Sequence, residues 1–323
     1  MISTHGPHSI GRASHLLVDG ARGDRLIGVE VWYPQAAPAG EPMMYELLPG
    51  VGFYGAARSG GAPLATPLPT VVLSHGHMGT RLVYSQLCEA LASHGYAVIA
   101  LDHPGDTMAD VLLGAGVDED TNISMRVADL EFLLRSALGE VPGFEHGLSL
   151  KADEISALGH SFGAYAIFAW AGTDHGRKSL RSLVALEPYL MRLTPEELRQ
   201  VRTTALIVAG DKDATTPVDS NIHPVLPHLD AQATTALLLA NVGHQGCSDV
   251  GMYIEVAPTV PGVPDFVLEF MQTMGDDTTG TAGEPWRPVT EAHIELVTTW
   301  LANVGDSATM QHVAAKYKGS VIA

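Results

Sequence analysis

Positively charged residues are scarce in this sequence. Among 323 residues, 18 are Lys or Arg and 36 are Asp or Glu, which gives a formal net charge of −18. Nucleic-acid binding needs clustered Lys and Arg side chains, and the sequence has no dense basic segment. We therefore expect no nucleic-acid partner, and the acidic balance also disfavours binding to anionic membranes.

Cysteines and long apolar runs are scarce as well. Cys88 and Cys247 are too few for a disulfide framework. No stretch approaches the ~18 uninterrupted apolar residues of a membrane-spanning helix. Residues 1–17 lack the basic segment and apolar core of a signal peptide. We therefore expect a cytoplasmic protein without an integral membrane segment.

The helical H-E-x-x-H motif of metal-dependent hydrolases is absent too. The closely spaced His223 and His228 are separated by two prolines, a pattern that indicates a loop. Hydrolysis assisted by a metal ion is therefore disfavoured.

Short apolar runs alternate with helical patterns along most of the chain. This alternation is typical of βαβ units around a mostly parallel sheet, so we predict a single α/β domain over residues 1–323 with helices on both faces. The expected strands are residues 25–34, 70–76, 96–105, 155–159, 181–186, 203–209 and 234–240, and the expected helices include 81–94, 122–138 and 289–304.

Two segments rich in Gly, Pro, Ala or Thr interrupt this pattern. Residues 36–69 and 257–288 are predicted as surface loops near a site, the second with a helical piece around F-V-L-E-F-M-Q-T-M. Long loops of this kind are typical sources of binding selectivity.

One apolar run ends at the sequence Gly159-His160-Ser161-Phe162-Gly163, and a helical pattern follows at once. Glycines at these two positions let a strand and a helix approach closely around a residue with strained backbone angles. The spacing G-x-S-x-G between a strand and a helix is typical of a nucleophilic serine. Ser161 is therefore the predicted nucleophile, and the alternative is a glycine-rich turn with an idle serine.

A serine hydroxyl attacks a carbonyl only when a neighbouring base takes its proton. His244 lies on a Gly-containing loop after the last apolar run, which fits the chain order Ser, acid, His. Two segments offer the acid that orients this histidine. One contains Asp213, with Asp211 beside it, and the preceding strand ends at Glu187. Asp213 is the predicted acid and Glu187 is the alternative.

The segment V-V-L-S-H-G-H-M-G-T ends a predicted strand in His-Gly. We predict that the N–H of His77 joins the N–H of Phe162, at the start of the helix, as donors to an oxyanion. Met78, His160, Phe53 and Tyr54 are the candidates for contact with substrate, and ordinary packing is the alternative for them. Phe162 is a further candidate for an apolar wall at the site.

Four segments of the sequence share the features of one known superfamily. They are V-W-Y-P, the stretch from V-V-L-S-H-G-H-M-G-T to A-L-D-H-P-G, L-G-H-S-F-G and G-H-Q-G-C-S-D, all within residues 25–250. They resemble the α/β-hydrolases, and within them the platelet-activating-factor acetylhydrolase-like and predicted dienelactone hydrolase group. The resemblance implies a mostly parallel central sheet of about eight strands. It also implies a serine esterase without metal or organic cofactor, whose first oxyanion donor is His77.

The resemblance leaves the acid and the substrate open. In the acetylhydrolase branch the acid follows the strand after the serine helix, which matches Glu187. In the cutinase-like branch a D-x-x-x-P-V segment supplies it, which matches Asp213. Dienelactone hydrolases proper use a cysteine nucleophile, whereas this chain has Ser161, so their substrate is not transferred.

The predicted function is hydrolysis of small carboxylic esters with short to medium acyl groups through an acyl-enzyme. An amidase or a cutinase-like polyester hydrolase uses the same residues and is the nearest alternative. A binding protein that keeps the fold without catalysis is the alternative from a different class.

Overall fold

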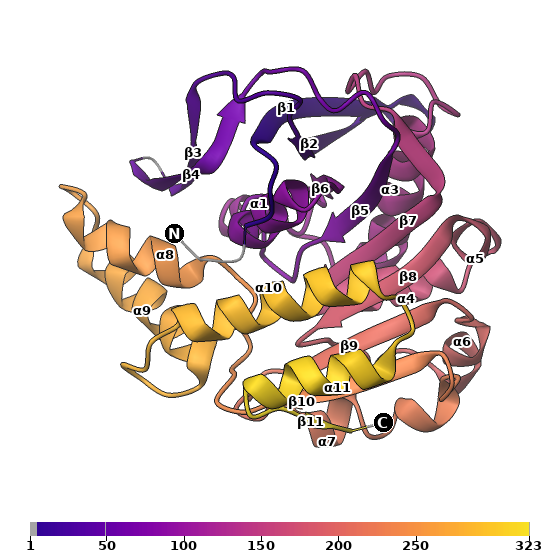
Figure 1. Ribbon diagram of the computed structural model, residues 1–323. Coiled ribbons are helices and arrows are strands. Elements are labelled where there is room, and N and C mark those ends of the chain that lie inside the picture. The colour runs from indigo at the N-terminus through magenta and orange to yellow at the C-terminus, as the bar shows by residue number, and fades with distance from the viewer. Residues whose placement is uncertain (1–4, 49, 323) are drawn as a thin grey trace.

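The strands of the protein form one continuous sheet (Figure 1). The structure is a computed structural model, which describes residues 5–48 and 50–322. The strands are β1 (Ile10–Asp19), β2 (Arg25–Pro34), β3 (Pro42–Leu48), β4 (Val51–Ser59), β5 (Leu68–Ser74), β6 (Ala97–Leu101), β7 (Leu150–His160), β8 (Leu180–Leu186), β9 (Thr204–Gly210), β10 (Thr234–Leu239) and β11 (Ser320–Val321).

The centre of this sheet is parallel. Eleven strands of the described chain are paired in the order β11-β10-β9-β8-β7-β5-β6-β2-β1-β4-β3. Neighbours from β10 to β6 run parallel, whereas β2 pairs antiparallel with β6 and with β1. The mostly parallel sheet is confirmed. It has more strands than the expected eight because the β3–β4 hairpin and the short β11 extend its edges.

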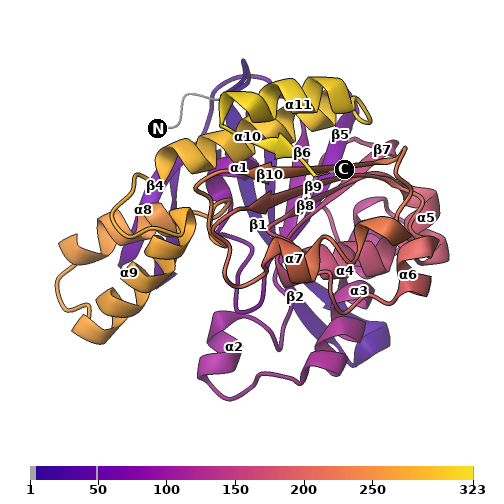
Figure 2. The same ribbon diagram turned by 90° about the horizontal axis from the view of Figure 1, so that it is seen from below.

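Helices cover both faces of the sheet (Figure 2). Within the described chain, α1 (Ser85–Ser93), α10 (Arg287–Ala302) and α11 (Ser307–Lys316) lie on one face. The opposite face is covered by α3 (Glu119–Ala137), α4 (Phe162–Ala171), α5 (Asp174–Ser179), α6 (Pro195–Gln200) and α7 (Val218–Asn221). The remaining helices lie near the ends of the strands: α2 (Met108–Leu112), α8 (Val250–Val256) and α9 (Asp265–Thr279).

Alternation along the parallel strands divides the apolar residues between two cores. In β5, Val71 and Leu73 contribute to the core under α1 and α10, whereas Val72 contributes to the core under α3 and α4. Successive side chains of a strand point to opposite faces, so both cores are built from the same short apolar runs. This arrangement fixes the carboxyl ends of β5, β7, β8, β9 and β10 along one edge, where the chain leaves for its loops.

The prediction of a single loop over residues 36–69 is wrong, because two strands lie within it. Residues 42–48 and 51–59 form the antiparallel hairpin of β3 and β4, and residue 49 lies outside the described residues. Tyr45 and Phe53 lie opposite each other in this hairpin and are buried. The carboxylate of Glu89 on α1 accepts the N–H groups of Ala56 and Ala57, which anchors β4.

The C-terminal third is more helical than expected. The predicted helical piece within residues 257–288 is confirmed as α9, but it extends over Asp265–Thr279. The helix predicted at 289–304 corresponds to α10, and α11 follows it. No helix in the described parts of the chain is long and apolar enough to cross a lipid bilayer.

Candidate active site

Ser161 occupies a sharp turn between β7 and α4. Its φ of 52° and ψ of −120° are strained for a residue with a side chain. A Cβ on Gly159 would lie 2.4 Å from the carbonyl oxygen of Gly163, and one on Gly163 would lie 2.1 Å from that of Ser74. Only glycines therefore permit this close approach of helix and strands, which holds the serine at the sheet edge.

A chain of hydrogen bonds connects Ser161 to two distant segments. Its Oγ lies 2.9 Å from Nε2 of His244, and Nδ1 of His244 lies 2.9 Å from Oδ2 of Asp213. All three residues are buried, with 8%, 5% and 6% of their surface exposed. Because the carboxylate of Asp213 accepts a hydrogen bond from Nδ1, the ring proton of neutral His244 lies on Nδ1. Nε2 is therefore free to accept the proton of Ser161.

The surroundings of Asp213 keep its carboxylate ionised. Its Oδ1 accepts the N–H groups of Thr215 and Thr216 at 2.9 and 2.7 Å, and its Oδ2 accepts the hydroxyl of Thr216 at 2.6 Å. Burial raises the pKa of Asp213, but the hydrogen bonds from His244 and Thr216 outweigh burial and hold the pKa below its ordinary value. Thr216 was missed by the sequence analysis, although an Asp side chain in a turn commonly accepts hydrogen bonds from the backbone that follows it, here at Thr215 and Thr216.

Glu187, the alternative acid, is bonded to a different histidine. Its Oε1 lies 2.7 Å from Nε2 of His293, a residue of α10, and both side chains are fully buried. Nδ1 of His293 lies 2.8 Å from the carbonyl oxygen of Val289. Glu187 has no hydrogen bond to His244 within the described chain, so Asp213 is the carboxylate that meets His244.

The loop that bears His244 is anchored on both sides. The N–H of Gly243 donates to the carbonyl of Thr278, and the N–H of Gln245 donates to that of Asp277, at the end of α9. Further along, the buried carboxylate of Asp249 accepts hydrogen bonds from the N–H and hydroxyl of Ser85 at the start of α1. These anchors fix the backbone from which the imidazole projects.

His160, predicted to contact substrate, lines the cavity that contains Ser161 and also links parts of the site. Its Nε2 lies 2.8 Å from the carbonyl oxygen of His244, and its Nδ1 lies 2.8 Å from the hydroxyl of Tyr84. Burial, with a smaller effect of neighbouring His244, lowers the pKa of His160 to about 3. The neutral ring therefore donates from Nε2 and accepts at Nδ1, and both nitrogens are already engaged.

The two predicted oxyanion donors belong to segments that adjoin Ser161. The turn and loop hydrogen bonds of the described residues include none donated by the N–H of His77 or Phe162. Phe162 is the first residue of α4, where N–H groups have no partner within the helix. A Cβ on Gly76 would lie only 3.2 Å from Cβ of Ser161, so the loop that precedes His77 packs directly on the serine.

A cavity of about 280 Å³ opens onto Ser161, His244 and His77. Met78 lines it, as predicted, with a φ of 56° that is unusual for methionine. The apolar part of its lining is contributed by several elements, namely Leu47, Val83, Met108, Val250, Tyr253, Phe270, Met271 and Met274. A second cavity of about 330 Å³, lined by Phe162 and Tyr189, also reaches Ser161.

Phe53 and Tyr54 do not line the cavity at Ser161. Phe53 packs against Tyr253, behind the wall of the Ser161 cavity, and 61% of Tyr54 is exposed. Both line a separate cavity next to Glu89 and Met252. The prediction that they contact substrate at Ser161 fails because the hairpin β3–β4, absent from the expected fold, directs them elsewhere.

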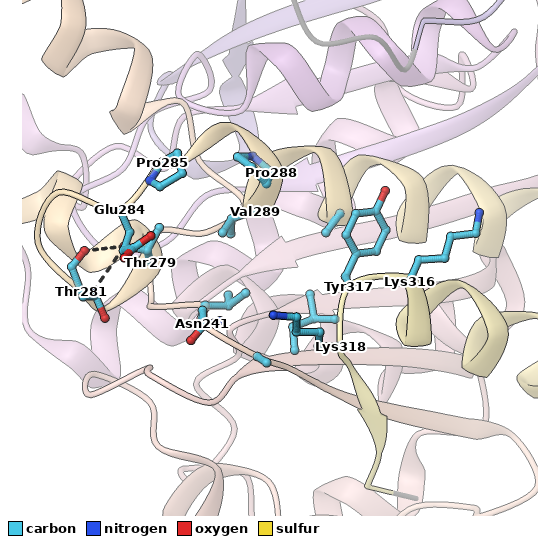
Figure 3. Close-up of a pocket in the computed structure, with 14 residues that line it drawn as sticks. Asn241, Thr279, Thr281, Glu284, Pro285, Pro288, Val289, Lys316, Tyr317 and Lys318 are labelled. Atoms are coloured by element: carbon cyan, nitrogen blue, oxygen red, sulfur yellow. Dashed lines mark hydrogen bonds between the residues drawn. The ribbon is translucent and has the colours of Figure 1, made fainter.

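A larger hollow lies away from the serine. A cavity of about 430 Å³ is bounded by Asn241 after β10, by the segment that contains Thr281 and Pro285, and by Tyr317 and Lys318 after α11 (Figure 3). It contains neither Ser161 nor His244 among its lining residues, so it contributes nothing to the predicted chemistry.

The two cysteines are free and buried. The sulfur of Cys247, a carboxylate oxygen of Glu187 and a ring nitrogen of His160 lie within 4.8 Å of one another, a donor set that could bind a metal ion. Binding there would require His160 to give up Tyr84 or the carbonyl of His244. The arrangement is therefore better explained as packing beneath the site.

The architecture matches that of a solved esterase. The ferulic acid esterase from Streptomyces cinnamoneus is similar over 97% of this chain and 96% of its own, with a TM-score of 0.75 and 20% identity. The chain has the α/β-hydrolase fold. The expected fold is thereby confirmed.

Sequence comparisons agree with this assignment. A family model described as serine aminopeptidase, S33, matches residues 65–211 of this chain. A probable 1-alkyl-2-acetylglycerophosphocholine esterase from Arthroderma benhamiae is 33% identical over 32% of this chain and 27% of its own. Cutinase est1 from Thermobifida alba is 26% identical over 53% of this chain and 51% of its own. The chain thus spans about half or less of these relatives.

Proposed function

We propose that this α/β-hydrolase cleaves carboxylic esters through an acyl-enzyme on Ser161. The observation that supports this most strongly is the unbroken series of hydrogen bonds from Ser161 through His244 to Asp213, at 2.9 Å each. An imidazole with one nitrogen at a hydroxyl and the other at a carboxylate has the geometry of a general base for that hydroxyl.

In the proposed acylation, His244 accepts the proton of Ser161 as Oγ attacks the ester carbonyl. The carbonyl oxygen becomes an oxyanion, which the N–H groups of His77 and Phe162 stabilise. His244, now protonated and paired with ionised Asp213, gives its proton to the leaving alcohol. The C–O bond of the alcohol breaks, and the acyl group remains on Ser161.

In deacylation, water takes the place of Ser161 as the nucleophile, and Ser161 becomes the leaving group. A water molecule gives its proton to Nε2 of His244 and attacks the acyl carbon, and the same two N–H groups bind the new oxyanion. Collapse returns the proton to Ser161 and releases the carboxylic acid. Every group in this cycle belongs to the chain or to the substrate, so we propose no cofactor.

The cavity beside Ser161 supports esters with a short to medium apolar acyl group. Its walls include Met78, Met108, Met271 and Met274, and methionine side chains adapt to ligands of irregular shape. A volume of about 280 Å³ is at the lower end of typical small-molecule pockets. We therefore propose a small-molecule ester as substrate.

A cutinase-like activity on polyester is the second candidate. It is favoured by the likeness to Cutinase est1 and by the match of D-x-x-x-P-V at Asp213. Release of soluble acid from a polyester film, compared with turnover of p-nitrophenyl butyrate, separates the two. An amidase would be recognised by turnover of the matching anilide.

The test of the proposal uses a fluorophosphonate probe and p-nitrophenyl esters of graded acyl length. Wild type should be labelled and should turn over the short and medium esters, and Ser161→Ala should lose both properties. Ser220, an exposed serine outside the site, provides the control Ser220→Ala, which should behave as wild type. Wild-type rates in Ser161→Ala would contradict the mechanism, and a folded wild type with neither labelling nor turnover would favour a binding protein.

A further inference from the structure

A buried arginine lies directly behind the loop that precedes His77. Arg126, on α3, is fully buried. Each of its three side-chain nitrogens has an acceptor: Nε donates to Asp106, Nη1 to the carbonyl of His75 and Nη2 to the carbonyl of Gly76. Burying a charge is costly unless it is paired and fully hydrogen-bonded, as it is here.

We propose that Arg126 is a positioning residue that aims the N–H of His77 at the oxyanion. This inference rests on the proposed function. The peptide between Gly76 and His77 is planar and trans, so its carbonyl and its N–H point in opposite directions. The guanidinium holds the carbonyl of Gly76 at 3.1 Å and thereby directs the N–H of His77 away from α3.

Other groups hold the same carbonyl. The N–H of Gly79 donates to it at 3.0 Å, and Nδ1 of His75 donates at 2.6 Å. Nε2 of His75 accepts the N–H of His103, which fixes the ring proton on Nδ1. The peptide before it is fixed as well, since the N–H of Gly76 donates to the hydroxyl of Tyr84. Rotation of the 76–77 peptide would break three hydrogen bonds at once.

Arg126 differs from these neutral donors in two respects. Its charge strengthens the hydrogen bond to Gly76 and polarises that peptide, which makes the N–H of His77 a better donor. Its Cζ also lies 5.1 Å from the centre of the Phe162 ring, within the range of a cation–π contact. Arg126 thus contacts the peptide that bears the N–H of His77, through the carbonyl of Gly76, and the side chain of Phe162.

Asp106 completes the arrangement. Its carboxylate accepts from Arg126 and is hydrogen-bonded to Nδ1 of His77, so one acid joins the arginine to the side chain of the donor residue. The bond to His77 and the charge of Arg126 hold the pKa of Asp106 below its ordinary value despite burial. The anion therefore balances the buried guanidinium.

The test compares Arg126→Lys and Arg126→Met with wild type, using p-nitrophenyl butyrate and an alkyl trifluoromethyl ketone that forms an oxyanion on Ser161. We expect kcat to fall about 10- to 100-fold in Arg126→Met, with a smaller fall in Arg126→Lys, because one misaimed donor costs less than a missing one. The Ki of the ketone should rise by a similar factor, while KM changes by less than about twofold.

Arg12 provides a matched control. It is also a buried arginine that pairs with a carboxylate, Glu30, donates to a backbone carbonyl, that of Met44, and lies over the ring of Tyr45. Arg12→Met should lower the melting temperature, as Arg126→Met should, but leave kcat and the Ki of the ketone unchanged in the folded enzyme.

Three outcomes would overturn the inference while leaving the proposed function intact. The first is a folded Arg126→Met variant with wild-type kcat and Ki, and the second is an effect confined to KM. The third is a loss of kcat and of ketone binding equal to that in Arg12→Met.

If neither Arg126 variant folds, the Asp106→Asn variant provides the test, because it keeps the arginine and removes the charge that orients it. Lower kcat and weaker ketone binding would support the inference, and unchanged values would contradict it. Turnover by Ser161→Ala would instead overturn the proposed function.

Discussion

Two neighbouring strands of the sheet each deliver a buried carboxylate to a histidine. Glu187 follows β8 and pairs with His293 at 2.7 Å, and Asp213 follows β9 and pairs with His244 at 2.9 Å. The pairs are alike in burial and distance and differ in what the second ring nitrogen meets. In His293 it donates to the carbonyl of Val289, whereas in His244 it faces the hydroxyl of Ser161.

This difference separates a structural pair from a candidate catalytic one. Both nitrogens of His293 face acceptors, so its ring is held as an imidazolium, and the charge of Glu187 raises its pKa against the effect of burial. His244 has one acceptor and one hydroxyl, so it can exchange a proton with a reacting group. A carboxylate–histidine pair is therefore not sufficient evidence of a base.

The largest expected effect is on turnover. Asp213→Asn should lower kcat by about 10⁴-fold, because an amide no longer fixes the imidazole proton on the side away from Ser161. Glu187→Gln should keep kcat within about tenfold of wild type, because Glu187 does not touch His244. Steady-state kinetics on p-nitrophenyl butyrate, with folding checked by circular dichroism, make the comparison. The reverse ranking would assign the acid to Glu187.

Stability should rank the same two variants the other way. Glu187→Gln leaves His293 buried beside a neutral partner, and breaking a buried pair in this way costs about 3–5 kcal/mol. Urea unfolding should show this loss, together with a smaller one for Asp213→Asn, whose residue retains two backbone donors. Equal losses of unfolding free energy in the two variants would contradict the distinction between a structural pair at Glu187 and a catalytic pair at Asp213.

A smaller effect is expected from Thr216, which donates to Oδ2 of Asp213. Thr216→Val keeps the shape and removes a hydrogen bond to a charged group, worth about 1.5–3 kcal/mol. If that bond orients the acid, kcat falls by about 10- to 100-fold with little change in KM. Thr216→Ser restores the hydroxyl and should recover most of the rate; an equally slow serine variant would point to lost packing instead.

The smallest effect is a pH dependence of stability from the pair of His293. A histidine whose folded-state pKa is raised contributes stability that is complete below its ordinary pKa near 6.5. That contribution is lost as the pH rises through the higher folded-state pKa. The difference in unfolding free energy between wild type and His293→Gln should therefore shrink as the pH rises from about 6.5 into the alkaline range. A difference that grows over this interval would contradict the assigned imidazolium.

The sequence was sufficient to predict those residues of the candidate site that belong to a local sequence pattern. Ser161 stands between glycines that only a close strand–helix turn requires, and His244 follows the last parallel strand. The choice between Asp213 and Glu187 depended on which histidine each one reaches. Glu187 meets His293 across 106 positions of the chain, and no spacing rule connects a strand end to a distant helix.

The dependence on long-range contacts also explains the wrong prediction for residues 36–69 and the failure to predict Arg126. Residues 36–69 as a whole are rich in Gly, Pro and Ala, so their composition favoured a loop, although 42–48 and 51–59 form strands. Pairing across the hairpin and the anchor at Glu89 outweighed that local preference. Arg126 was missed because a lone arginine in a predicted helix has the pattern of a solvent-exposed residue. Only the fold brings α3 behind the loop before His77.

The central claim is that Ser161 becomes acylated, and the mass of the enzyme during turnover tests it most directly. Asp213→Asn should slow deacylation, so rapid acid quenching after mixing with p-nitrophenyl butyrate should trap a butyryl adduct. Peptide mapping should place the added acyl group on Ser161, in the peptide that contains Gly159 and Gly163. An adduct on another residue, or ester turnover without any adduct in a Ser161→Ala variant, would contradict the account.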